Sequence, residues 1–273
     1  EISKMQKAYK LHGVRRHYDW GGTAYIPNLM KTNNTDQQPF AEYWMGAHAS
    51  APAQIETQNG LVPIHEFGAI PYLFKILDVA KMLSIQVHPS KENAVIGFAL
   101  EEKAGIAINA SNRNYKDQNH KPEVMVALSD FWLLHGFLAP ELLAARLHDC
   151  HYFNSLQDYF NGVDYEGLYQ YFMQLSSQDA DIILKPLMMD AVASVQSDQI
   201  DKSHPHWWAN KYYNGVVPES NIDKGIFSIY ILNIVQVKKY QAVFQGAGLL
   251  HAYLEGQNIE LMSNSDNVLR GGL

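Results

Sequence analysis

The hydrophobic and polar residues of this chain follow two different spacings, and the spacing changes twice along its length. Residues 7–70 form short apolar pieces separated by Gly, Pro and Asn, which predicts short strands joined by loops. Residues 123–128 also alternate like a strand, and residues 226–244 are rich in β-branched side chains. The first and last parts of the chain are therefore expected to be β-structure.

One segment, Leu83-Ser84-Ile85-Gln86-Val87-His88, alternates strictly between apolar and polar residues. Successive side chains of a strand point to opposite faces, so Ser84, Gln86 and His88 are expected to share one face. The preceding run, Phe74-Lys75-Ile76-Leu77-Asp78-Val79, is also typical of a strand.

The spacing becomes helical at Ala139-Pro140-Glu141, and apolar residues recur at helical intervals through about residue 198. Within this part, Pro186 should begin a helix or kink one. A loop rich in His, Trp and Asn is expected at residues 201–225, and a shorter helix rich in Ala, Glu and Lys at residues 91–110.

These spacings together predict a mainly β protein with a helical insertion. We expect residues 1–138 and 226–273 to form one barrel, and residues 139–225 to form an α-helical subdomain that interrupts it.

Composition and charge narrow the class of protein. Of the 273 residues, 47% are hydrophobic, enough for a sizeable core, and no run of 18 apolar residues occurs. The net charge is −7, and the 21 Lys and Arg are spread along the chain, which argues against nucleic-acid or membrane partners. The single cysteine, Cys150, excludes an intrachain disulfide and suits the cytoplasm.

Four good metal-ligand donors lie at strand-like positions: Gln86, His88, Glu123 and His251. Two imidazoles, one amide oxygen and one carboxylate suit zinc or another borderline cation, and leave room for a water or substrate oxygen. Spacing alone cannot show that the four converge. Each of them can equally be a surface residue or a hydrogen-bonded one.

Further charged residues lie close to these donors along the chain: His120, Lys121, Glu260, Asp266 and Arg270. Lys121 and Arg270 could clamp an anion such as phosphate, and Glu260 could act as a general base if burial raises its pKa. Ordinary salt bridges and loop caps are the alternative for each residue.

Three other patterns carry less weight. His204-Pro205-His206 has ligand-like spacing, but we expect a turn packed by Trp207 and Trp208. No helix start follows Gly246-Ala247-Gly248, so it offers no phosphate cradle. The G-x-S-x-G and G-x-G-x-x-G motifs are absent, which argues against the corresponding hydrolases and dinucleotide enzymes.

The chain resembles type I phosphomannose isomerases, zinc enzymes of the cupin superfamily, through motifs in the family's order. The motifs are Tyr18-Asp19-Trp20-Gly21, Ala41-Glu42-Tyr43-Trp44-Met45-Gly46-Ala47-His48, Leu83-Ser84-Ile85-Gln86-Val87-His88-Pro89, Asn114-Tyr115-Lys116-Asp117, Asn119-His120-Lys121-Pro122-Glu123, His251-Ala252-Tyr253 and Asn264-Ser265-Asp266-Asn267-Val268-Leu269-Arg270. The resemblance implies a cupin (jelly-roll) barrel with a helical insertion. It also implies interconversion of mannose 6-phosphate and fructose 6-phosphate by proton transfer through an enediolate.

The resemblance also implies roles for single residues. Gln86, His88, Glu123 and His251 fall on the family's four zinc-ligand positions, which implies one Zn²⁺ per chain. The residues that fall on active-site positions or beside them are Ser84, His120, Lys121, Tyr253, Glu260, Asp266 and Arg270. We expect Ser84, Lys121, Tyr253 and Arg270 to bind substrate. Glu260 is the first choice of base, with His120, Lys121 and Asp266 as alternatives.

Two other functions fit the same residues. One is a metal-binding cupin module that binds a sugar phosphate without turnover, and the other is an isomerase of unphosphorylated mannose. The chain also departs from the family at its end. Members continue after the arginine with a lysine-containing segment and a second barrel, whereas Gly271-Gly272-Leu273 ends this sequence. We therefore expect the C-terminal barrel to be absent from it.

Overall fold

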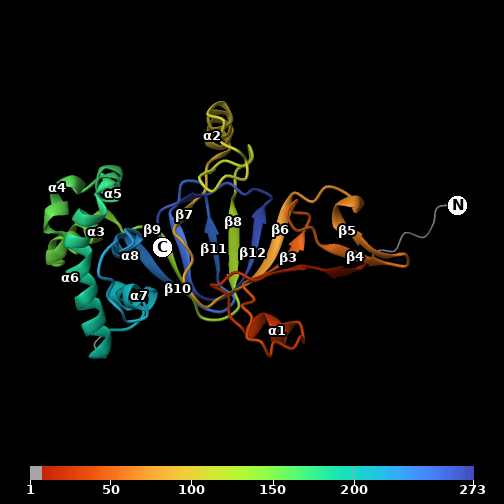
Figure 1. Cartoon of the computed structure of the whole chain (residues 1–273), viewed down its shortest axis with the longest axis horizontal. Coiled ribbons are helices and arrows are strands. Elements are labelled where there is room, and N and C mark those ends of the chain that lie inside the picture. The colour runs from red at the N-terminus through yellow and green to blue at the C-terminus, as the bar shows by residue number, and fades with distance from the viewer. Residues whose placement is uncertain (1–7, 199) are drawn as a thin grey trace.

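The computed structural model describes residues 8–198 and 200–273, so the first seven residues of the predicted barrel lie outside it. The described part is built around one large antiparallel sheet, with helices on one side and a smaller sheet on the other (Figure 1). The mainly β fold with a helical segment that the sequence predicts is confirmed.

The strands of the main sheet come from both ends of the described chain. They are β2 (Val14–Arg16), β3 (Glu42–Gly46), β6 (Tyr72–Val79), β7 (Gln86–Val87), β8 (Glu123–Ala127), β9 (Phe131–Phe137), β10 (Leu232–Val237), β11 (Ala242–Gln245), β12 (His251–Ser263) and β13 (Leu269–Arg270). The order is β10-β9-β12-β6-β3-β2, while β7 and β8 also pair with β12, β11 with β8, and β13 with β7. Strands from the two β parts of the sequence thus pair in one sheet, while three strands of the first part (residues 10–12, 54–57 and 60–63) form a separate sheet.

The longest strand, β12, holds this sheet together. It has 13 residues and pairs with β9 and β7 through its first part, and with β6 and β8 from Gly256 onward. Gly256 has φ of 126°, and a Cβ there would lie 2.6 Å from a ring carbon of Phe131. Glycine permits this conformation and close approach, so β12 can change partners and line one interior with both halves of the sheet.

The interior contains both an apolar cluster and buried charged side chains. The buried apolar side chains are Leu77, Val79, Met125, Ala127, Phe131, Leu133, Val237 and Tyr253. On β8, Glu123 is buried on the same face as Met125, and on β12 Glu260 is buried on the same face as Met262. Strand alternation therefore carries two carboxylates into the interior.

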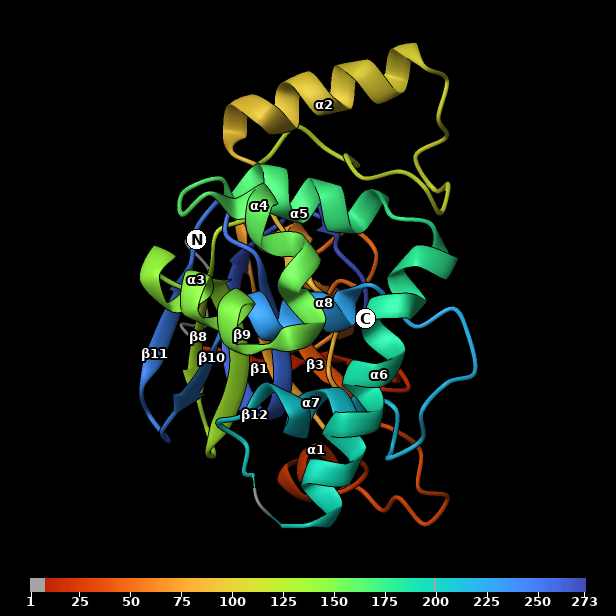
Figure 2. The same ribbon diagram turned by 90° about the vertical axis from the view of Figure 1, so that its left-hand side faces the viewer.

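A helical segment covers one outer side of the sheet (Figure 2). It comprises α3 (Pro140–Asp149), the 3₁₀ turn η2 (His151–Leu156), α4 (Gln157–Phe160), α5 (Tyr165–Gln174), α6 (Ser177–Gln196), α7 (Pro205–Tyr212) and α8 (Gly225–Ile231). Its apolar core continues into Leu134 of β9 and into Ala252 and Leu254 of β12. The helices are therefore fixed to the strand that organises the barrel.

Two helices lie where the sequence predicted other structure. Residues 226–231 were expected to be a strand, but they belong to α8, whose seven residues are all buried. Complete burial removes the amphipathic spacing of a helix, so the β-branched residues misled the prediction. Residues 205–212 were expected to be loop, but they form α7. His204 caps this helix and Pro205 occupies its first turn, where a missing N–H costs nothing.

Of the two outcomes predicted for Pro186, a helix start or a kink, the helix start is wrong, because Pro186 lies inside the 20-residue helix α6. Pro186 cannot donate to the carbonyl of Ile182, four residues earlier. The side chain of Ile182 is 73% exposed, so this turn faces solvent, where water can bond the free carbonyl.

The remaining elements lie around the barrel. A small sheet contains β1 (Lys10–His12), β4 (Gln54–Thr57) and β5 (Gly60–Pro63), and the short helical pieces are α1 (Tyr25–Leu29) and η1 (Ile64–Phe67). The predicted helix at 91–110 is α2 (Lys91–Lys103), capped by the Ser90 side chain. Among the described helices, none has the length and apolar character needed to cross a membrane.

Candidate active site and metal centre

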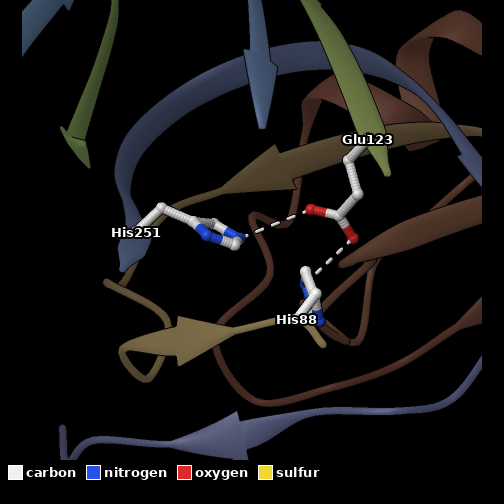
Figure 3. A group of neighbouring side chains, drawn as sticks. All are labelled: His88, Glu123 and His251. Carbon is white, nitrogen blue, oxygen red and sulfur yellow. Dashed lines mark ion pairs between the residues drawn. The ribbon is translucent and has the colours of Figure 1, made fainter. Parts of the chain in front are cut away.

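Three of the predicted metal ligands converge in the interior of the barrel (Figure 3). His88 follows β7, Glu123 begins β8 and His251 begins β12. One ligand atom from each lies within 4.8 Å of the others, and all three residues are buried. His88 Nε2 is 3.3 Å from one Glu123 oxygen, and His251 Nε2 is 3.4 Å from the other.

The outer ring nitrogens orient the two imidazoles. His88 Nδ1 lies 2.9 Å from the carbonyl oxygen of Asn267, and His251 Nδ1 lies 3.0 Å from that of Leu249. A carbonyl only accepts hydrogen bonds, so each Nδ1 carries a hydrogen, and in the neutral ring the Nε2 then presents a lone pair. Burial lowers the pKa of His88, which favours the neutral ring.

The ligand group therefore presents acceptors that face one another. His88 Nε2 is buried without a hydrogen-bond partner among the described residues. Burial alone would raise the pKa of Glu123, but the nearby charge of Lys121 acts against it, and the pKa lies well below its usual value. Two neutral imidazoles and one carboxylate around a common point fit a divalent cation such as zinc.

Gln86, the fourth predicted ligand, occupies the strand next to His251. It is the register partner of His251 on one side and of Arg270 on the other. Its side chain lines the main cavity, as does that of His251. The pairing of β7 with β12 and β13 therefore brings an amide, an imidazole and a guanidinium to one place.

A cavity of about 900 Å³ opens beside the ligand group. The sequence-predicted residues in its lining are Ser84, Gln86, Lys121, Glu123, Tyr253, Glu260, Asp266, Arg270 and His251. His88 is not among the lining residues. His120 is exposed and does not line the cavity, and its carbonyl oxygen accepts a hydrogen bond from Ser263 Oγ at 2.6 Å. We therefore give His120 no part in the chemistry proposed below.

Lys75, which the sequence did not single out, also lines this cavity. Its Nζ is 2.7 Å from Glu260 Oε1 and 3.8 Å from Glu42 Oε2. Trp44 Nε1 donates to Glu42, and Tyr253 OH donates to the other Glu260 oxygen at 2.7 Å. One lysine thus bridges two carboxylates, each held by an aromatic donor.

Burial and charge act in opposite directions on this group. Burial alone would lower the pKa of Lys75, but Glu260, Glu42 and Glu123 together raise it above its usual value. Burial, followed by the Glu260 carboxylate, raises the pKa of Tyr253 well above its usual value. In the free protein, the lysine is therefore a cation and the tyrosine a neutral donor.

The sequence contained a sign of this group. Lys75 interrupts the apolar run of β6, where a charged residue needs a buried partner. Glu42 and Trp44 share a face of β3, and β3 pairs with β6 so that Trp44 lies opposite Lys75. Their partner Glu260 lies far along the chain, and only the pairing of β6 with β12 joins them.

At the cavity rim, Asp266 faces a histidine. His48 Nε2 lies 3.3 Å from Asp266 Oδ1, and the histidine is buried while the carboxylate is half-exposed. The hydrogen bond from His48 lowers the pKa of Asp266. Asp266 is therefore ionised and held in position, which makes it better suited to orient a hydroxyl than to exchange protons near neutral pH.

Asn267 connects the ligand group to the loop before β8. Its side-chain oxygen accepts from the backbone N–H groups of Lys116 and Asp117, and its amide donates to the carbonyl oxygens of Asp117 and Asn119. The same residue is fully buried and offers its own carbonyl to His88. One side chain thus positions both the loop and a predicted ligand.

Comparison with known proteins gives consistent results. The family profile described as phosphomannose isomerase type I, catalytic domain, matches residues 8–139. Mannose-6-phosphate isomerase of Salmonella typhimurium is 36% identical, over 97% of this chain and 70% of the relative. The Escherichia coli enzyme is 34% identical over the same shares, and the rat enzyme 31% identical over 98% and 70%.

Solved structures extend this similarity to the fold. A zinc-bound mannose 6-phosphate isomerase superposes with a TM-score of 0.83 at 34% identity, over 97% of this chain and 70% of that one. The Salmonella typhimurium enzyme bound to fructose 6-phosphate and zinc superposes with a TM-score of 0.80 at 34% identity, over the same shares.

Proposed function

Because the chain belongs to the type I phosphomannose isomerase family, we propose that it interconverts mannose 6-phosphate and fructose 6-phosphate with one bound Zn²⁺. The observation that carries this proposal is the convergence of His88, Glu123 and His251 beside a cavity lined by lysine and arginine. A relative that binds zinc and fructose 6-phosphate supports the same assignment.

The zinc would be held by Gln86, His88, Glu123 and His251. The Nδ1 contacts of His88 and His251 aim their Nε2 atoms at the carboxylate of Glu123, and this arrangement suits a divalent cation. When bound, zinc supplies a Lewis acid that favours negative charge on a nearby sugar oxygen. The remaining chemistry falls to the side chains of the cavity.

Proton transfer falls to Glu260, whose carboxylate is the only one in the cavity lining held by both Lys75 and Tyr253 among the described residues. We propose that Glu260 takes the proton from C2 of mannose 6-phosphate and returns it to C1, while a second proton moves from O2 to O1. The product is fructose 6-phosphate, and no net proton is gained or lost. Lys75 keeps the carboxylate in place and offsets the negative charge of the enediolate.

The phosphate would lie against cations at the cavity wall. Arg270 is in register with Gln86, which places it next to the ligand group. Its guanidinium can bind a phosphate through two parallel hydrogen bonds. Ser84, two residues before Gln86, adds a hydroxyl. Lys121 lies 3.4 Å from Glu123 and adds a positive charge between the ligands and the sugar.

We further propose that residues 139–225, together with the rest of α8 to Ile231, form an insertion in the barrel and that the protein works in the cytoplasm. The helices with a shared core between β9 and β10 support the first proposal. The second is supported by a single cysteine, Cys150, left as a free thiol.

A coupled assay for fructose 6-phosphate tests the function. The zinc-loaded protein should turn over mannose 6-phosphate and leave unphosphorylated mannose unchanged. Chelation should abolish turnover, and added zinc should restore it. Zinc binding without turnover would contradict the proposal and favour a non-catalytic module, while equal turnover of both sugars would remove the role of the phosphate site.

A further inference from the structure

A second cavity, of about 260 Å³, lies within the helical segment and shares no lining residue with the main one. It lies where the end of α3 meets η2, the middle of α6, the start of α7 and the last turn of α8. Its polar lining residues include Arg146, Tyr152, Asp190, His204, His206 and Tyr230. None of them has a part in the proposed isomerisation.

The guanidinium of Arg146 is not directly paired with the described residues of this cavity, although the nearby charge of Asp149 acts to raise its pKa against the effect of burial. Its guanidinium forms no ion pair or hydrogen bond with the residues that the structure describes, and burial lowers its pKa. The two carboxylates of the same cavity contact histidines and not Arg146. Asp190 lies 3.5 Å from His206 Nε2, and Asp149 lies 3.0 Å from His148. A half-buried arginine without a partner favours an anionic ligand.

His204 adds a hydrogen-bond donor beside this charge. Its Nδ1 accepts from the backbone N–H of His206 at 3.1 Å, so the hydrogen of the neutral ring is on Nε2. No described residue accepts a hydrogen bond from that Nε2. The rings of His204 and His206 are 4.6 Å apart, and His206 Nδ1 is fixed by Tyr230 OH at 2.6 Å. The ring of His204, which carries the donor, is therefore held against the fixed ring of His206.

A metal ion is a poorer occupant than an anion. Among the described residues, His88, Glu123 and His251 are the only group of three or more possible ligands whose ligand atoms all lie within 4.8 Å of one another. The histidines and Asp190 of the second cavity do not meet this condition, and Arg146 would repel a cation there.

One helix joins the two cavities. His204 and His206, at the start of α7, line the second cavity, and Lys211 and Tyr212, at its end, line the main one. Lys211 also pairs with Glu255 of β12, the strand that carries His251 and Glu260. A ligand that shifts the start of α7 therefore acts on the wall of the main cavity.

We propose that the second cavity is an effector site for a small anion, a phosphate or a carboxylate compound, bound by Arg146 and His204. Occupancy changes the affinity of the main cavity for its sugar phosphate through α7. This proposal goes beyond the isomerase activity, which does not require the site.

Binding is tested by calorimetry on the zinc-loaded protein, with inorganic phosphate and citrate as separate probes that distinguish the two anion classes. Arg146→Gln should weaken the binding of the preferred probe at least tenfold. His204→Asp should do the same, because aspartate keeps the helix cap but places a negative charge beside Arg146. His204→Asn keeps the cap without the charge and should retain more binding. Lys103→Gln, which removes an exposed charge of α2, should change nothing.

The effector role is tested by the KM for mannose 6-phosphate, measured with and without the probe. Phosphate can also compete in the main cavity, and this competition should be equal in wild type and in Arg146→Gln. The proposal is supported if the probe changes the KM of the wild type at least twofold more than it changes the KM of Arg146→Gln. Circular dichroism and zinc content confirm that each variant is folded. Binding that is the same in all variants, or binding without any KM difference, would overturn it.

Discussion

Lys75 and Glu260 are register partners on β6 and β12, and their charged atoms lie 2.7 Å apart inside the barrel. Both side chains are nearly inaccessible to solvent, at 9% and 3% exposed. A buried ion pair of this kind is costly to desolvate and rarely stabilises a fold by itself. Its place in the main cavity, next to the candidate metal ligands, therefore favours a role in chemistry.

Lys75→Met should remove activity without removing the metal. We expect kcat to fall at least a hundredfold because Glu260 loses the cation that positions it, while zinc content stays at one per chain. The unfolding free energy should also fall by about 3 kcal/mol, because two carboxylates lose their buried partner. Steady-state kinetics, metal analysis and urea unfolding measure the three effects. Lys239→Met, at an exposed site, is the control, and unchanged kcat in Lys75→Met would remove this role.

Arg270→Ala should lower kcat/KM for mannose 6-phosphate by at least two orders of magnitude, because the guanidinium that binds the phosphate is lost. Zinc content should not change, since Arg270 is the strand partner of Gln86 and not a ligand itself. Arg270→Lys keeps the charge but not the paired hydrogen bonds, so its kcat/KM should lie between those of the wild type and Arg270→Ala. Full turnover by the alanine variant would place the phosphate elsewhere.

Asn258→Val should stabilise the protein. Asn258 is fully buried on β12, and neither atom of its amide has a hydrogen-bond partner among the described residues. Valine suits a strand and removes the unpartnered amide, so the unfolding free energy should rise by about 1 kcal/mol. Urea unfolding measures the change. A loss of stability would show that the amide is bonded in solution.

Glu255 should make the attachment of the helices to the barrel sensitive to acid. Burial alone would raise its pKa, but Lys202 and Lys211 outweigh burial and lower it below 4.5. A carboxylate with a lowered pKa in the folded state stabilises the fold above its unfolded pKa, and that contribution is lost as the pH falls further. Glu255→Gln should therefore be less stable than wild type at pH 7, with the difference shrinking below about pH 4.5. Urea unfolding across this range measures it, and a difference independent of pH would contradict the ion-pair explanation.

The sequence predicted residues that the structure brings together in the candidate site, but it missed two helices. Alternation along residues 83–88 placed Gln86 and His88 on one face, and the structure puts His88 in the ligand group and Gln86 in the cavity lining beside it. Spacing could not show that Glu123 and His251 join them, because that depends on β12 changing its strand partners at Gly256. The motif resemblance supplied this convergence instead.

The failures have physical causes of the same kind. In the sequence, Lys75 is a single charge in an apolar run, and nothing there indicates its partner Glu260, because only strand pairing brings the two together. The residues of α8 read as a strand, because burial on all sides removes helical periodicity. His204-Pro205 is a cap followed by a proline in the first helical turn, a helix start that the reading as a turn missed.

The central claim is that Gln86, His88, Glu123 and His251 hold one zinc ion inside the barrel. Anomalous scattering at the zinc edge, on crystals of the purified protein, tests it most directly. We predict a single peak among the His88, Glu123 and His251 side chains, about 2 Å from each ligand nitrogen and oxygen, which disappears in His88→Ala. A zinc peak elsewhere, or stoichiometric zinc retained in that variant, would contradict the account.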